Sequence, residues 1–65
     1  MKKAKLAARI PPERYHSLDG STPQPGDLVT LDQGFTFPAM VACIGQSGET
    51  KWEAEVLESE VEVLP

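Results

Sequence analysis

Few side chains in the sequence have the type and spacing that catalysis requires. Cys43 is the single cysteine and His16 the single histidine, so a thiol nucleophile has one candidate base and a zinc ion would lack ligands. Residues 45–48 (Gly-Gln-Ser-Gly) lack the Lys-Ser or Lys-Thr pair of a phosphate-binding loop. We therefore expect no enzyme activity and no cofactor, with Cys43 a buried free thiol.

The charged side chains are more informative, because the two signs are separated along the chain. Five of the six basic residues precede Tyr15, nine of the ten acidic residues follow it, and the net charge is −4. We divide the 65 residues into a basic flexible N-terminal arm, 1–14, and one acidic domain, 15–65. Such asymmetry is typical of an interaction tail, or of two parts of a chain that attract each other.

Apolar residues of the acidic domain recur with the period of two that is typical of strands. The pattern predicts strands at 27–31, 39–44, 51–57 and 61–64, separated by turn-forming residues. The run 39–44 is apolar throughout, so we expect it to be buried on much of both faces. The strands should share one interior, formed by Val29, Leu31, Ile44, Trp52, Val56 and Val63.

Two segments of this pattern are similar to the small SH3-like barrels: Pro25–Leu31 (PGDLVTL), where Gly-Asp opens the first core strand, and Glu55–Leu64 (EVLESEVEVL), where a short turn precedes the last one. The resemblance covers residues 25–64. It implies an all-β fold, a small SH3-like barrel or rolled antiparallel sheet of four to five short strands with an irregular N-terminal arm. It also implies a binding module more often than an enzyme, although a fold does not identify a partner.

Two sets of side chains are candidates for contacting another protein. The first is a row of outward-facing carboxylates that would dock a basic partner, and the second is a pair of loop aromatics that would add apolar contact. The residues are Glu53, Glu55, Glu60 and Glu62 for the acidic face, and Phe35 and Phe37 for the aromatics. The alternatives are a solvated acidic edge that discourages aggregation, and aromatics used for core or rim packing.

We therefore expect a non-enzymatic protein–protein interaction module or small accessory subunit. An alternative is a nucleic-acid-associated regulator whose arm contacts phosphates through Lys2, Lys3, Lys5 and Arg9, although the acidic domain would repel nucleic acid. Two further possibilities are that the arm folds over the acidic face, and that the chain self-associates to support a thin core. The sequence has neither an export signal nor an apolar stretch of about 20 residues, so we expect a cytoplasmic protein without a membrane span.

Overall fold

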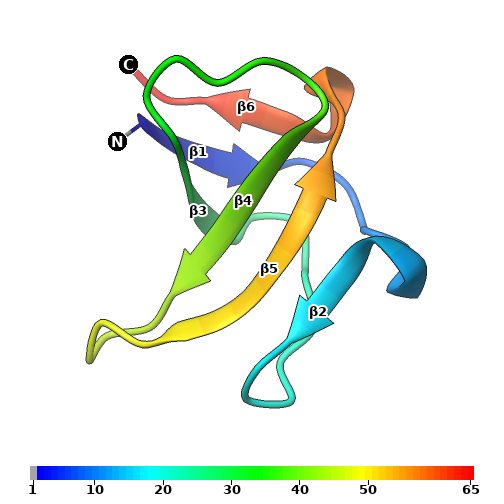
Figure 1. The fold of residues 1–65 in the computed structure, drawn as a ribbon, viewed down its shortest axis with the longest axis vertical. Coiled ribbons are helices and arrows are strands. Elements are labelled where there is room, and N and C mark those ends of the chain that lie inside the picture. The colour runs from blue at the N-terminus through cyan, green and yellow to red at the C-terminus, as the bar shows by residue number, and fades with distance from the viewer. Residues whose placement is uncertain (1) are drawn as a thin grey trace.

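The computed structural model describes residues 2–65 and shows an all-β chain (Figure 1). Antiparallel strands form one open sheet in the order β2-β5-β4-β3-β1-β6. The strands are β1 (Lys2–Leu6), β2 (Tyr15–Ser17), β3 (Leu28–Leu31), β4 (Ala39–Ile44), β5 (Thr50–Val56) and β6 (Val61–Val63). Single 3₁₀ turns, η1 (Pro12–Arg14) and η2 (Glu58–Glu60), lead directly into the two edge strands. Across residues 2–65 the sheet thus has six strands, not the four to five that were predicted.

The prediction of an irregular N-terminal arm is wrong for its first residues. Lys2–Leu6 is a strand inside the sheet, paired with β3 on one side and with β6 on the other. Figure 1 shows β1 and β6 side by side, with both ends of the chain at the same side of the molecule. The strand is hard to recognise because its exposed positions are all lysines, while only Ala4 and Leu6 alternate inward.

The core lies on the inner face of the curved sheet. Trp52 is 1% exposed at its centre, and the predicted inward positions Val29, Leu31 and Val56 are confirmed. Tyr15, Phe35, Phe37 and Val61 pack against its edge. The buried members are Ala4, Leu6, Ile10, Val29, Leu31, Ala39, Val41, Cys43, Trp52, Ala54 and Val56.

The expectation that β4 is buried on both faces is wrong. Its side chains alternate, so Ala39, Val41 and Cys43 enter the core. Met40 and Ile44 point the other way and are 59% and 44% exposed. A single curved sheet has only one inner face, so the apolar residues of β4 that alternate away from it remain at the surface. Val63, also predicted to be interior, is 37% exposed on the edge strand β6.

The turn before β3 fixes the first strand to the rest of the sheet. Gly26 has a φ of +97°, a conformation that favours glycine. Its N–H donates to the carbonyl of Leu6 at 2.7 Å, and the N–H of Leu6 donates to the carbonyl of Asp27 at 2.8 Å. The Asp27 carboxylate accepts the N–H of Gln24 at 3.0 Å, which holds the loop before the turn. The Pro-Gly-Asp sequence therefore extends the β1–β3 ladder by further hydrogen bonds.

Replacing Leu6 tests whether β1 belongs to the core. Leu6→Ala should lower the free energy of unfolding by about 2–5 kcal/mol, because it removes buried methyl groups and leaves a cavity. Leu18→Ala is the matched control, since Leu18 is 53% exposed, and should change stability by less than about 0.5 kcal/mol. Urea unfolding followed by Trp52 fluorescence measures both. A Leu6→Ala chain already unfolded in buffer would be the same result in stronger form, whereas equal midpoints would place β1 outside the core.

Candidate functional site

Strand register aligns five side chains in one row across the outer face, the side of the sheet opposite the core. The row crosses β1, β3, β4, β5 and β2 in turn, through Lys3, Thr30, Ala42, Glu53 and His16. Neighbouring strands lie about 4.8 Å apart, so the backbones at Lys3 and Glu53 are separated by roughly 14 Å, measured across the strands. A cation and a carboxylate therefore lie on either side of two small residues.

Large apolar side chains border this row. Leu28 and Met40 are each 59% exposed, and Ile44 is 44% exposed. One shallow hollow is lined by Lys3, Leu28, Thr30 and Ile44. An adjoining hollow, which shares Thr30 and Ile44 with it, is also lined by Asp32, Met40, Ala42 and Glu53. We call this surface the outer-face groove. Exposed apolar residues that gather in one patch mark contact surfaces more often than residues scattered singly.

The four predicted acidic residues do not form one row. Glu53 and Glu55 are exposed together on the outer face of β5, opposite Ala42 and Met40 of β4. Glu62 lies on β6, opposite Lys5 of β1. One row would require the last two strands to lie side by side, but the sheet order inserts β4, β3 and β1 between β5 and β6. The glutamates of β5 and β6 therefore occupy separate parts of the sheet.

Glu60 is occupied by an ion pair and is not part of a free acidic surface. Arg14 Nη1 donates to Glu60 Oε1 at 2.8 Å, and Nη2 donates to Oε2 at 2.6 Å. Nη1 also reaches the backbone carbonyl of Glu55 at 3.3 Å, and the N–H of Leu57 donates to Glu60 Oε1 at 2.8 Å. This arrangement joins η1 to η2, the turns that lead into the two edge strands. We call it the Arg14–Glu60 clasp.

The clasp shifts the titration of both partners. The hydrogen bonds from Arg14 lower the pKa of the Glu60 carboxyl below its usual value, against a smaller opposing effect of burial, and the N–H of Leu57 lowers it further. The hydrogen bond to Glu60 in turn raises the pKa of Arg14. The carboxylate is thus held in its charged form by a bidentate partner, which is the geometry that makes arginine–carboxylate pairs strong.

Phe35 and Phe37 lie in the loop between β3 and β4, and each is half-buried. Their ring centroids are 5.2 Å apart with the planes at 74°, an edge-to-face contact, and both pack against the core. A second shallow hollow follows this loop and is lined by Phe35 and Met40. Met40 thereby connects the loop aromatics to the outer-face groove. A role for either ring in binding stays a prediction.

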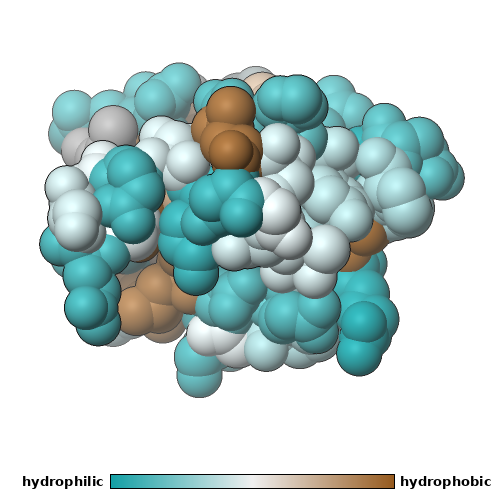
Figure 2. Space-filling view, turned by 90° about the horizontal axis from the view of Figure 1, so that it is seen from below, coloured by the Kyte–Doolittle hydropathy of each residue, from teal (hydrophilic) through white to brown (hydrophobic). Residues whose placement is uncertain are grey.

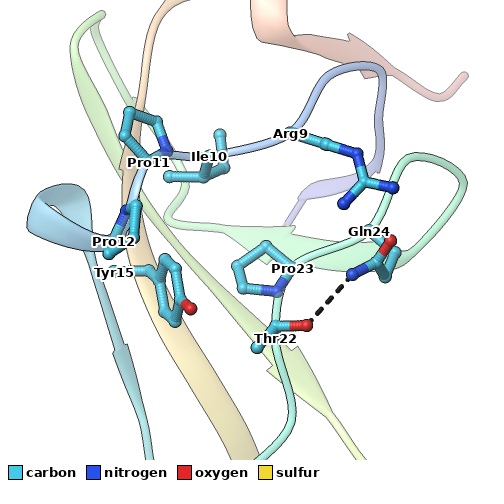
Figure 3. Close-up of a pocket in the computed structure, with 8 residues that line it drawn as sticks. All are labelled: Arg9, Ile10, Pro11, Pro12, Tyr15, Thr22, Pro23 and Gln24. Carbon is cyan, nitrogen blue, oxygen red and sulfur yellow. Dashed lines mark hydrogen bonds between the residues drawn. The ribbon is translucent and has the colours of Figure 1, made fainter.

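The four predicted arm cations do not gather in one patch. Lys3 and Lys5 share the outer face of β1, whereas Lys2 alternates to the other side. Arg9 lies beyond the strand and borders a different hollow, between η1 and the loop before β3 (Figure 3). The basic character of the segment is therefore divided between surfaces.

The hollow that Arg9 borders was not expected from the sequence. In Figure 3 the ring of Tyr15 lies near Pro12 and Pro23, with Arg9 at the opposite end beside Gln24. It draws on residues 9–15 and 22–24, which are separate in the chain, so no local pattern predicts it. Its lining consists of Arg9, Ile10, Pro11, Pro12, Tyr15, Thr22, Pro23 and Gln24. This lining contains no carboxylate, histidine or cysteine, so it holds no acid–base pair.

The cysteine and the histidine do not form a nucleophile and base. Cys43 points into the core opposite Trp52, and burial raises the pKa of its thiol. His16 is exposed in the row of the outer face, on the opposite side of the sheet. Among residues 2–65, no group of three or more His, Cys, Asp or Glu side chains could hold a metal ion.

Comparisons with known proteins do not assign the chain to a family. No family model, curated protein or solved structure matches it. Within residues 2–65, no helix is long and apolar enough to cross a membrane.

The clasp should make stability depend on pH through Glu60. A carboxyl whose pKa is lowered by folding contributes stability that is present above its unfolded pKa of about 4.3 and lost as the pH falls through the folded value. Glu60→Gln should thus have a lower free energy of unfolding than the unmodified chain at pH 7, and this difference should shrink as the pH falls. Glu58→Gln removes the same charge from the same turn and is the control.

Urea unfolding between pH 3 and pH 7 measures these differences. The Glu58→Gln curve should run parallel to that of the unmodified chain. Two results would contradict the clasp. One is a difference in free energy of unfolding between Glu60→Gln and the unmodified chain that stays constant down to pH 3. The other is a difference no larger than the one that Glu58→Gln produces.

Proposed function

We propose that the chain is a non-enzymatic protein–protein interaction module or small accessory subunit that binds through the outer-face groove. The observation that carries this proposal is the exposure of Leu28, Met40 and Ile44 together on one sheet face. Water-exposed apolar side chains that share a patch gain free energy when a partner covers them. Figure 2, seen from below the view of Figure 1, shows a mostly hydrophilic surface that carries separate hydrophobic patches.

The opposite charges at the two ends of the groove would favour one orientation of the partner. Glu53 and Glu55 provide an acidic end, which suits a partner with a basic group placed beside an apolar one. Lys3 provides a basic end on the far side of Thr30 and Ala42. Such complementary charges orient a partner and speed its approach more than they raise affinity. The loop aromatics extend the apolar area, because Phe35 and Met40 line a common hollow.

We also propose that the sheet is an SH3-like roll. Three features support this: the consecutive pairing of β3, β4 and β5, the 3₁₀ turn between β5 and β6, and the return of β6 to pair with β1. In a rolled sheet of this kind the outer face remains accessible while the inner face is filled, as a binding module requires.

The nucleic-acid alternative stays a prediction with weaker support. Its cations are divided between surfaces, and Lys3 shares the outer face with Glu53 and Glu55. Charge reversal separates the two functions: Glu53→Lys with Glu55→Lys should weaken binding of a basic protein partner and, if anything, strengthen binding to nucleic acid.

Site-specific cross-linking tests the proposed function. A photoreactive residue at Met40 should form protein adducts in the native host cell, because Met40 is central to the proposed contact. The same residue at Gln46, exposed in the turn between β4 and β5, is the control and should give far fewer. Equal adducts at both positions, none at either, or adducts made of nucleic acid would contradict an interaction module that uses this face.

A further inference from the structure

We infer that the partner of the outer-face groove is a second copy of this chain, bound face to face about a two-fold axis. The inference rests on the proposed function, because it names the occupant of the same surface. It is carried by the self-complementary placement of charged and apolar residues across the sheet.

The charged residues of the row are placed so that two copies of the chain can pair them. Lys3 and Glu53 are the two charged members of one row, on either side of Thr30 and Ala42. Consider a two-fold axis that lies between the two facing sheets, parallel to the strands and above the line between β3 and β4. Rotation about this axis exchanges the two ends of the row. Lys3 of each copy then faces Glu53 of the other, which gives two equivalent ion pairs. An axis across the strands would instead set Lys3 against Lys3 and Glu53 against Glu53, so the charges select one orientation.

The apolar residues agree with the same axis. Leu28 and Ile44 lie two positions beyond Thr30 and Ala42 on their strands and line the same hollow. The rotation that exchanges β3 and β4 places Leu28 of one copy against Ile44 of the other. The small side chains Thr30 and Ala42 meet at the centre, where they allow the sheets to approach to the roughly 10 Å typical of packed sheets.

Further charged residues border this surface. Asp32 lines the hollow with Met40, and Glu55 is opposite Met40 on β5. Lys5 also points outward, and it is opposite Glu62 of β6 in the same copy. Glu60 is held in the clasp at the edge of the sheet. Lys3 and Glu53 are the charged pair of the central row that a second copy can complete.

Size gives a physical reason for such a contact. A chain of 65 residues buries only about 60% of the surface that its unfolded form exposes. A symmetric dimer adds a second layer over the face that the core leaves uncovered, and it needs no further sequence to do so. Closed two-fold dimers are also the commonest way in which soluble chains assemble.

Charge exchange measured by sedimentation equilibrium at low salt tests the inference. The intact chain should show a monomer–dimer equilibrium, and Lys3→Glu or Glu53→Lys alone should weaken it at least tenfold. An equimolar mixture of the two variants should form a heterodimer, because one copy then carries two acidic ends and the other two basic ends. The chain with both exchanges should recover the dimer. Lys2→Glu and Glu58→Lys make the same changes in charge away from the groove and should leave the equilibrium unchanged.

The outcomes that overturn the inference are a chain that is monomeric at every concentration, a dimer insensitive to both reversals, or a mixture that fails to associate. Circular dichroism and urea unfolding of each variant confirm that it is folded. The Met40 cross-link separates the two proposals. An adduct of twice the chain mass supports a second copy. If the chain is monomeric and its adduct contains a different protein, the proposed function is retained and this inference is overturned. The absence of any adduct overturns both.

Discussion

A single sheet has two faces, and a chain of this length has enough side chains to fill only one core. Among residues 2–65, the core is a cluster of eleven buried hydrophobic residues that includes Trp52, and every strand that contributes to it must present its alternate residues on the other side. In β4 those alternate residues include Met40 and Ile44. The exposed apolar patch is therefore the direct consequence of an apolar strand in a sheet with one covered face. Both proposals for function follow from that constraint.

Some of the charges that are separated in the sequence meet in the fold. The basic N-terminal segment is a central strand that brings Lys5 opposite Glu62, and Arg14 closes the clasp with Glu60 across the two edge strands. The clasp joins the turns before β2 and β6, which are the ends of an otherwise open sheet. Bidentate hydrogen bonding to a half-buried carboxylate gives this contact a fixed geometry that an exposed surface pair lacks. The basic segment thus meets the rest of the chain through strand pairing and the Arg14–Glu60 ion pair, and it does not cover Glu53 and Glu55, which remain exposed.

The sequence predicted the elements whose alternation is strong and left out those that depend on distant pairing. The strands at 27–31, 39–44, 51–57 and 61–64, with Trp52 buried, were predictable because their apolar residues recur every second position. Strand β1 was not, because Lys2, Lys3 and Lys5 resemble a solvated tail until β3 and β6 are present on both sides. Glu60 looked like its neighbours Glu58 and Glu62, since nothing local shows that Arg14, 46 residues away, reaches it. The outer-face groove was hidden for the same reason, as β4 looked doubly buried until the number of sheet layers was known.

The central claim is that Leu28, Met40 and Ile44 lie on a face that the core of one chain does not cover. Methyl signals of the dilute chain, measured by NMR with a soluble nitroxide that broadens solvent-accessible groups, test it most directly. The account predicts strong broadening of the Leu28, Met40 and Ile44 methyls and little effect on those of Leu6, Val29 and Val41. Protection of Met40 and Ile44 in the dilute monomer, or broadening of Leu6, would contradict it.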